Sequence, residues 1–583
     1  MPSCLIELDD LHSHHFRVTV SVPQPAAQQL LSLPVWINGS YMVREFSRHL
    51  SGITARQGRR AVALQQLDKT TWQAACSPRA ALVVSYRVYA FDNSVRAAFL
   101  DARRGFFNNT SLCLRVHGQE AAPHRLQLGR LPRGWQVATA MAPAADGTPL
   151  CFEAAGYDEL VDHPFELGVF WRGSFTAGGV PHDMVVSGAL PGFDGARLLA
   201  DVQKVCAAHM AFWHGDKREP PPFARYLFLL NAVDDGFGGL EHRASTALIA
   251  PRRDLPGVRQ DAGSDGHVSL LGLISHEYFH SWNVKRLKPA DLAAVDWSRE
   301  NHSRLLWFFE GFTSYYDELM LRRSGLIDAP RYLRLLAKTI NTVAATPGRQ
   351  VQSVADASFD AWVKYYRADE NTPNATVSYY AKGALVALCL DLTLRQHGGS
   401  LDAVMRALWQ RSGAGAGLGH ITEADIAEVL AQVAGVRLDA ELQAWVHGTG
   451  ELPLATLLPA MGVALRRERA GFAASLGLRL SEGPLSGVQV KAVLAGSAAA
   501  VAGVSAGDEL LAVDGWRIRR LDDALAWVAR AMPVTLLLVR DQRVLSLPLQ
   551  PQPASALAST VALVLADTPG RAEATRRRAW IDA

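Results

Sequence analysis

Residues 276–280 read HEYFH, a motif in which three residues separate two histidines. On a helix, His276 and His280 lie one turn apart on the same face, where two imidazoles can bind one Zn²⁺ ion. Glu277 is offset by one position and can reach a metal-bound water without being a ligand. The alternative is a pair of core histidines. A charged Glu277 among mostly apolar neighbours argues against it, because burying an unpaired carboxylate is costly.

A catalytic zinc site also needs a third protein ligand and an open coordination position. Glu310 is the candidate, because it is a lone carboxylate in a second apolar, helix-like segment, residues 305–316. The alternative is a position on the helix surface, and the aromatic and leucine neighbours of Glu310 argue against it. We expect Ser303 to cap this helix and Gly325 to end it.

A residue farther along this helix is expected to hold a ligand imidazole in place by bonding to its other ring nitrogen. The sequence does not choose among three side chains with suitable groups: Ser314, Asp317 and Glu318.

The chemistry that this set of residues indicates is metal-assisted hydrolysis. One zinc ion lowers the pKa of its bound water to about 7 and polarises the scissile carbonyl. Glu277 then takes a proton from that water and delivers it to the leaving amine. The tetrahedral oxyanion still requires a hydrogen-bond donor, which a nearby tyrosine or histidine can supply.

The segments around these residues indicate several domains with both strands and helices, a multidomain α+β chain. Residues 1–170 have mostly β-type patterns and predict a sandwich-like domain. Residues 16–22 alternate with period two, and 81–91 and 111–116 are further β-rich runs separated by turn residues. Residues 171–325, which carry HEYFH and Glu310, begin with a helical pattern over 198–212 and two strand-like runs at 226–230 and 247–250.

The rest of the chain divides into three further parts. Residues 326–460 are strongly helical, and Thr422 is expected to cap one of the helices there. Short strands and glycine turns return in residues 461–551, and the Ala/Pro-rich residues 552–583 are expected to form a tail.

Composition narrows the possible classes of protein. The chain has 583 residues, a formal charge of +3, 49% hydrophobic residues and 20% charged residues, which excludes a mainly disordered chain. The near-neutral charge argues against a nucleic-acid binder. No secretory leader and no uncharged apolar run long enough to span a membrane is evident. We therefore expect no membrane partner. The six cysteines lie far apart and form no CxxC pair, which argues against a thiolate zinc site or a dithiol redox site, and we expect a reduced, cytoplasmic protein.

Two pairs of motifs resemble zinc peptidases. HEYFH followed by WFFEGF (307–312) resembles the zinc-binding motifs of the gluzincins. This resemblance implies that two histidines and a glutamate bind zinc and that the catalytic domain is thermolysin-like. GGLEH (238–242) and YAKG (380–383) resemble motifs of gluzincin aminopeptidases. That resemblance implies that Glu241 pairs with the free α-amino group of the substrate and that Tyr380 stabilises the oxyanion.

The residues themselves support these roles less strongly than they support zinc binding. Gly238 and Gly239 allow another backbone to approach closely, so an edge strand there could pair with an extended peptide. Glu241 supplies a charge suited to an ammonium group, and His242 is expected to help line the same strand. The alternatives are a turn with a solvated acid at Glu241 and an ordinary buried tyrosine at Tyr380.

The whole chain resembles the glycyl aminopeptidase family, whose members append a PDZ domain. WINGSYMVREFSRH (36–49) and YAFDNSVRAAFLDARRGFFNNTS (89–111) are similar to signatures of the N-terminal domain of that family. Asn38 stands where a proline is expected. The resemblance implies a preference for small N-terminal residues such as glycine or alanine.

Residues 502–515 resemble the core of a PDZ domain, with a Gly-Asp turn, a short strand and a second Asp-Gly turn. Leu476, Gly477 and Leu478 could form a loop whose backbone N–H groups bind the C-terminal carboxylate of a peptide. The alternative for this domain is a purely structural role beside the catalytic part.

We therefore expect a zinc aminopeptidase with one Zn²⁺ ion that acts on peptides with a free N-terminus. Two rival hypotheses remain open. One is an endopeptidase of the same chemistry, and the other is a non-catalytic PDZ adaptor that binds peptides.

Overall fold

The computed structural model describes residues 1–583 apart from 216–219, 259–262, 417–418, 484 and 583. It divides into two compact units, one formed by 1–301 with 409–421 and the other by 302–408 with 422–583.

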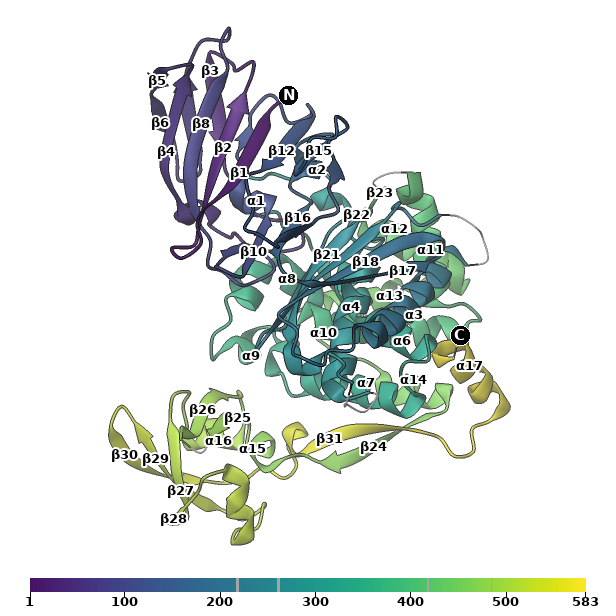
Figure 1. Cartoon of the computed structure of the whole chain (residues 1–583). Helices are drawn as coiled ribbons and strands as arrows, with labels where there is room; N and C mark the ends of the chain where they lie inside the picture. Colours follow the sequence, from purple (N-terminus) through teal and green to yellow (C-terminus); the bar gives the residue numbers. More distant parts are fainter. Residues whose placement is uncertain (216–219, 259–262, 417–418, 484, 583) are drawn as a thin grey trace. The chain divides into compact units, whose positions relative to one another are not determined.

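The N-terminal part of the first unit consists of three β-sheets (Figure 1). Their orders are β14-β15-β12-β1-β2-β8-β4-β5, β13-β16-β10-β9 and β11-β3-β7-β6. The strand bounds are β1 (Ser3–Asp10), β2 (His15–Val22), β3 (Gln28–Ser32), β4 (Leu50–Gln57), β5 (Arg60–Val62), β6 (Leu64–Gln66), β7 (Thr71–Ala75), β8 (Leu82–Tyr89), β9 (Ala98–Leu100), β10 (Arg104–Asn108), β11 (Arg115–Val116), β12 (His124–Leu128), β13 (Gln136–Ala138), β14 (Ala142–Pro143), β15 (Cys151–Ala154) and β16 (Pro164–Gly168).

Two of the three predicted strands here are confirmed, in β2 and β8, but the prediction of a strand over 111–116 is wrong. The chain forms a helical turn, α1 (Asn109–Leu112), before the two-residue strand β11. Asn109 Nδ2 donates to the carbonyls of Leu160 and His163, and the Tyr86 hydroxyl donates to the carbonyl of Leu112. These side-chain bonds to the backbone favour the turn over a strand.

A five-stranded sheet follows in the first unit. Its order is β17 (Trp171–Ala177), β18 (Val180–Ser187), β19 (Tyr226–Val233), β21 (Ser245–Pro251) and β20 (Gly238–Glu241). β18, β19 and β21 are parallel, and β20 pairs antiparallel with β21 as the edge strand. Helices α3 (Gly195–His214) and α4 (Asp265–Phe279) pack against this sheet and each other, and β22 (Leu287–Pro289) pairs with β23 (Gly419–Ile421).

The predicted helix at 198–212 and the strands at 226–230 and 247–250 are therefore confirmed. The chain then becomes helical, as expected. The helices are α5 (Leu306–Phe309), α6 (Gly311–Arg323), α7 (Ala329–Ala344), α8 (Val354–Phe359), α9 (Thr372–Ala375), α10 (Tyr379–Gln396), α11 (Leu401–Ser412), α12 (Glu423–Ala434), α13 (Asp439–Leu442) and α14 (Leu454–Leu457).

Two features of this helical region bear on the sequence predictions. Thr422 caps α12 in a capping box with Asp425, as predicted. By length and composition the segment Thr372–Gln396 could cross a membrane, but 78% of its most apolar window is buried inside the protein. Core helices pass the same test, so this segment is weak evidence for a membrane span.

The C-terminal part of the second unit contains one mixed domain and a two-stranded ribbon. The domain contains α15 (Phe472–Ser475), β25 (Leu478–Gly483), β26 (Gly487–Val493), α16 (Ala498–Ala502), β27 (Glu509–Val513), β28 (Trp516–Arg517), β29 (Val534–Arg540) and β30 (Arg543–Leu549). The ribbon pairs β24 (Val463–Arg469), which leads into the domain, with β31 (Ser559–Leu565), which leaves it (Figure 1).

Residues 552–583 do not form a tail. They contain β31 and a final helix, α17 (Arg571–Ile581). Trp580 is fully buried and its indole N–H donates to the Tyr315 hydroxyl, while Arg395 donates to the carbonyl of Ala579. Trp580 and the neighbouring Ile581, which is 1% exposed, anchor this segment. The Ala/Pro-rich composition of the segment gives no sign of them.

Candidate metal centre and peptide site

Helix α4 keeps the two histidines of HEYFH one turn apart. The Ser264 side chain caps its first turn by accepting from the His267 N–H. The helix ends at Phe279, and His280 is the residue that follows its last turn, with its N–H 3.3 Å from the His276 carbonyl oxygen. The two imidazole rings are 4.7 Å apart and nearly perpendicular.

Glu310 lies at a break in the apolar segment that was predicted to be one helix. It separates α5 from α6, although the Glu310 N–H still bonds to the Leu306 carbonyl at 2.8 Å. Ser303 does not cap α5, whose preceding residue is Leu305. Gly325 follows the end of α6 with φ +74°, as expected for a helix terminator.

The glycines of the WFFEGF and YAKG motifs explain why α6 and α10 lie so close. A Cβ added to Gly311 would lie 2.5 Å from the Cα of Gly383. Burial is the largest cause that raises the pKa of Tyr365 and of Tyr379, and the negative charge of Glu310 raises both further. Two motifs some seventy residues apart are thus joined by a contact that only glycine allows.

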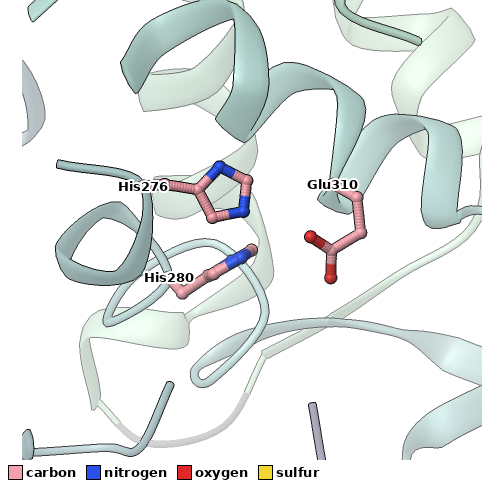
Figure 2. Close-up of side chains that lie close together, drawn as sticks. All are labelled: His276, His280 and Glu310. Carbon is pink, nitrogen blue, oxygen red and sulfur yellow. The ribbon is translucent and has the colours of Figure 1, made fainter. Parts of the chain in front are cut away.

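The structure brings His276, His280 and Glu310 together (Figure 2). Their ligand atoms all lie within 4.8 Å of one another, and both His280 and Glu310 are only 2% exposed. Two imidazole nitrogens and one carboxylate form a donor set that suits zinc, and the spacing is consistent with a single ion.

The group that orients His280 is a backbone carbonyl. His280 Nδ1 lies 2.8 Å from the carbonyl oxygen of Asn283, which can only accept, so Nδ1 carries the proton and Nε2 carries the lone pair. The three side chains of the second helix that the sequence offered for this task, Ser314, Asp317 and Glu318, do not include this carbonyl. One of them, Glu318, has a pKa raised to about 8 by burial and by the neighbouring charge of Asp317.

Gly239 of edge strand β20 packs directly against Glu277. A Cβ added to Gly239 would lie 2.5 Å from the Cγ of Glu277 and closer still to its carboxylate. Glu277 is 5% exposed. Glycine is therefore required at 239 because the proposed catalytic carboxylate occupies the space that a side chain would need.

Glu241, at the end of β20, is packed against the N-terminal domain. Glu241 is 3% exposed, and a Cβ added to Gly39 would lie 2.6 Å from Glu241 Cδ. Gly39 has φ +95°, a conformation that favours glycine. Gly39 belongs to the segment 36–49, which resembles a family signature, but no pattern in the sequence predicts this contact.

His242 points into a buried ionic cluster with Asp162, Arg243 and Lys285. The Lys285 ammonium lies 2.8 Å from Asp162 Oδ1, the Arg243 backbone N–H donates to Asp162 Oδ2 at 2.9 Å, and His242 Nδ1 is 3.6 Å from Oδ1. Burial opposes ionisation of Asp162, but Lys285 and Arg243 outweigh it and hold its pKa well below the usual value. Burial also lowers the pKa of His242.

Tyr380 lies in the first turn of α10, where Ser378 caps the helix by accepting from the Ala381 N–H. The Tyr380 side chain is half-buried and stacks on Tyr379, and its hydroxyl lies 3.3 Å from that of Tyr366.

The loop that was predicted to bind a peptide carboxylate is packed by the protein itself. The N–H of Leu476 donates to the carbonyl of Phe472 and that of Gly477 to Ala474. A Cβ added to Gly477 would overlap Ser497 and lie 3.5 Å from a methyl carbon of Leu557. Two of the three backbone donors predicted for the ligand, those of Leu476 and Gly477, thus bond within the chain, and Leu478 begins β25.

Comparison with known families gives three matches along the chain. The model of the M61 glycyl aminopeptidase family matches residues 269–386, the model of its N-terminal domain matches 3–169, and a PDZ model matches 489–540. These matches and the strand and helix arrangement confirm the multidomain α+β class, with an N-terminal β-sheet domain, a catalytic domain and a PDZ domain.

Solved structures include a full-length relative. The crystal structure of an aminopeptidase N family protein from Idiomarina loihiensis is 36% identical, covers 100% of both chains and has a TM-score of 0.92. An M1 zinc metallopeptidase from Deinococcus radiodurans is 14% identical over 78% of this chain and 95% of its own, with a TM-score of 0.47. The search of curated proteins finds no match.

Proposed function

Because the chain belongs to the M61 glycyl aminopeptidase family of zinc metallopeptidases, we propose that it removes small N-terminal residues, glycine or alanine, from peptides. The observation that carries this proposal is the convergence of His276, His280 and Glu310, which suits one zinc ion. When bound there, zinc supplies a Lewis acid that activates water and polarises the scissile carbonyl.

Glu277 is the group that moves the proton. Its carboxylate takes a proton from the attacking water and delivers it to the amine of the leaving peptide. The contact with Gly239 supports this role, because it holds the carboxylate beside the strand along which we expect the peptide to lie. Such fixed placement is what general acid–base catalysis requires.

Glu241 makes the enzyme an exopeptidase in this proposal. A buried carboxylate at the end of edge strand β20 attracts the ammonium group of a free N-terminus. Gly39, pressed against the same carboxylate, supports a narrow site for the first residue and hence the preference for glycine or alanine that the family implies.

Tyr380 is assigned to the oxyanion. Its hydroxyl donates to the charge that develops on the carbonyl oxygen, so removing it should affect the transition state more than substrate binding. The helix packing at Gly311 and Gly383 supports this role by holding the start of α10 near Glu310.

The decisive experiment combines metal analysis with substrate comparison. The purified chain should contain about one zinc, and glycyl and alanyl peptides should be hydrolysed until a chelator is added. N-acetylated versions of the same peptides should not be cut. Equal cleavage of both would establish an endopeptidase, and a metal-free chain without turnover would establish a binding protein.

The variant Glu277→Gln separates catalysis from metal binding. It should retain zinc and lose about 10²–10⁴-fold in kcat, because it cannot accept the proton. Glu241→Gln is the matched carboxylate change on the neighbouring strand, and it should mainly raise KM for free peptides. Turnover by Glu277→Gln at the wild-type rate would contradict the mechanism.

A further inference from the structure

An arginine of the N-terminal domain reaches the backbone of edge strand β20. Arg96 lies between β8 and β9, and its Nη2 donates to the carbonyl of Gly239 at 3.2 Å. A Cβ added to Gly238 would lie 3.8 Å from Nη1 of the same guanidinium. Arg96 therefore lies beside the two glycines of the GGLEH motif. These glycines belong to β20, the strand that also packs against Glu277.

The guanidinium of Arg96 has hydrogen-bonding capacity that the protein does not use. Of its five N–H donors, one bonds to Gly239, and the Nε atom is buried without a partner among the described residues. Among those described residues, no carboxylate forms an ion pair with the Arg96 guanidinium. By contrast, all three side-chain nitrogens of Arg104, in the same signature segment, donate hydrogen bonds: two go to Glu166 at 2.7 Å and 2.8 Å, and one goes to Asn93 at 2.9 Å. A half-buried cation of this kind calls for an anionic ligand.

The order of residues along β20 places Arg96 on the leaving-group side. Glu241 stands where the free amine binds under the proposed function, Gly239 lies against Glu277 at the reaction centre, and Gly238 follows. Because a strand rises about 3.3 Å per residue, Glu241 and Gly238 are about 10 Å apart. An extended dipeptide or tripeptide spans about 7–10 Å by the same rise.

We propose that Arg96 binds the C-terminal carboxylate of short peptides, so that the site recognises both charged ends of a dipeptide or tripeptide. The proposal rests on the proposed aminopeptidase function and specifies its substrate class. The guanidinium keeps its bond to Gly239 and offers its remaining N–H groups to the carboxylate, in the charge-assisted geometry that arginine favours. In longer peptides only a neutral backbone carbonyl reaches this position.

The test compares peptides that differ only in their last group. kcat/KM is measured for glycyl dipeptides and tripeptides as free acids and as C-terminal amides, and for a glycyl pentapeptide in both forms. The wild type should prefer the short acids over the amides by about 10- to 100-fold, and the preference should disappear for the pentapeptide. Equal rates for short acids and amides would overturn the proposal while leaving the aminopeptidase function intact.

Variants separate ligand binding from a purely structural role. Arg96→Gln should reduce the acid-to-amide ratio to about one, and Arg96→Lys should restore part of it, because lysine keeps the charge but not the fork of donors. A structural role alone would lower the rates for acids and amides equally. Arg103→Gln, an exposed arginine in the same signature segment, is the control and should keep the wild-type ratio. If the wild type hydrolysed none of these peptides, the proposed aminopeptidase function would instead be refuted.

Discussion

Two edge strands, β20 and β25, lie where the sequence predicts peptide binding, β20 at the amine of a substrate and the start of β25 at the carboxylate of a PDZ ligand, and they differ in what surrounds them. β20 is largely buried, and two glycines are pressed against two carboxylates at its ends, Gly239 on Glu277 and Gly39 on Glu241. β25 is mostly exposed along its length, and the loop before it is closed by bonds to its own helix α15 and by Ser497.

The comparison shows that a glycine-containing edge strand is not by itself a peptide site. At β20 the space beside Gly239 is filled by the Glu277 carboxylate, to which we assign the proton transfer. At β25 the space at Gly477 is filled by a serine that caps α16. Under the proposed function, glycine therefore makes room for a catalytic group in one place and for ordinary packing in the other, and four substitutions test that distinction.

The largest effect is expected at Asp162, which supports the end of β20 through His242 and Arg243. Asp162→Asn leaves the Lys285 ammonium buried without its counter-charge and should lower the free energy of unfolding by about 3–5 kcal/mol. Chemical denaturation at pH 7 measures this. Asp146→Asn, at an exposed ion pair with Arg125, is the control and should leave the free energy of unfolding almost unchanged, because solvent screens an exposed pair.

The pH dependence of the Asp162 effect has a defined sign. The folded pKa lies below the ordinary value of about 3.9, so the ion pair stabilises the protein above that pH and its contribution is lost as the pH falls toward the folded pKa. The stability difference between wild type and Asp162→Asn should therefore shrink below about pH 4. A difference that stays constant with pH would show that Asp162 acts through packing alone.

Gly239→Ala should have the next largest effect and act on catalysis. The added methyl group must displace the Glu277 carboxylate, and a shift of about 1 Å can cost about 100-fold in kcat. Zinc content should remain near that of the wild type. Gly272→Ala lies on the same helix as Glu277, but no atom lies within 4 Å of its Cβ, so it should retain full activity.

Gly39→Ala tests whether the N-terminal domain shapes the amine site. The methyl group would collide with the Glu241 carboxylate, and kcat/KM for glycyl peptides should fall by about 10- to 100-fold. The control is Gly58→Ala, which also has a positive φ (+58°) but nothing within 4 Å. Gly58→Ala carries the backbone strain without the collision. Equal losses of kcat/KM in both variants would therefore show that Gly39 does not shape the amine site.

The sequence predicted the local elements well because their signals are local. HEYFH on α4, the strands β19 and β21 and the cap at Thr422 follow from periodicity and short-range hydrogen bonding. The convergence of Glu310 with the histidines was inferred from residue chemistry and family resemblance, and the structure bears it out.

Long-range contacts escaped prediction because nothing in the neighbouring residues signals them. Gly39, Arg96 and Asp162 come from loops of the N-terminal domain and reach β20 more than seventy residues later in the chain. Gly39 and Arg96 lie in segments that resemble family signatures, but without the fold these segments do not show which residues they contact. The buried Trp580 that anchors α17 is a similar case.

The smallest effect is expected in the loop before β25, where Gly477→Ala should change stability and leave catalysis almost untouched. At φ +78° the substitution carries the left-handed strain of about 1–2 kcal/mol, and overlap with Ser497 adds about 1–3 kcal/mol. Gly503→Ala, at φ +84° with nothing within 4 Å, carries the strain alone. Thermal unfolding of the two variants isolates the packing cost. If they unfold alike, the loop has room beside Ser497, and the contrast with β20 weakens because a peptide carboxylate could then approach it.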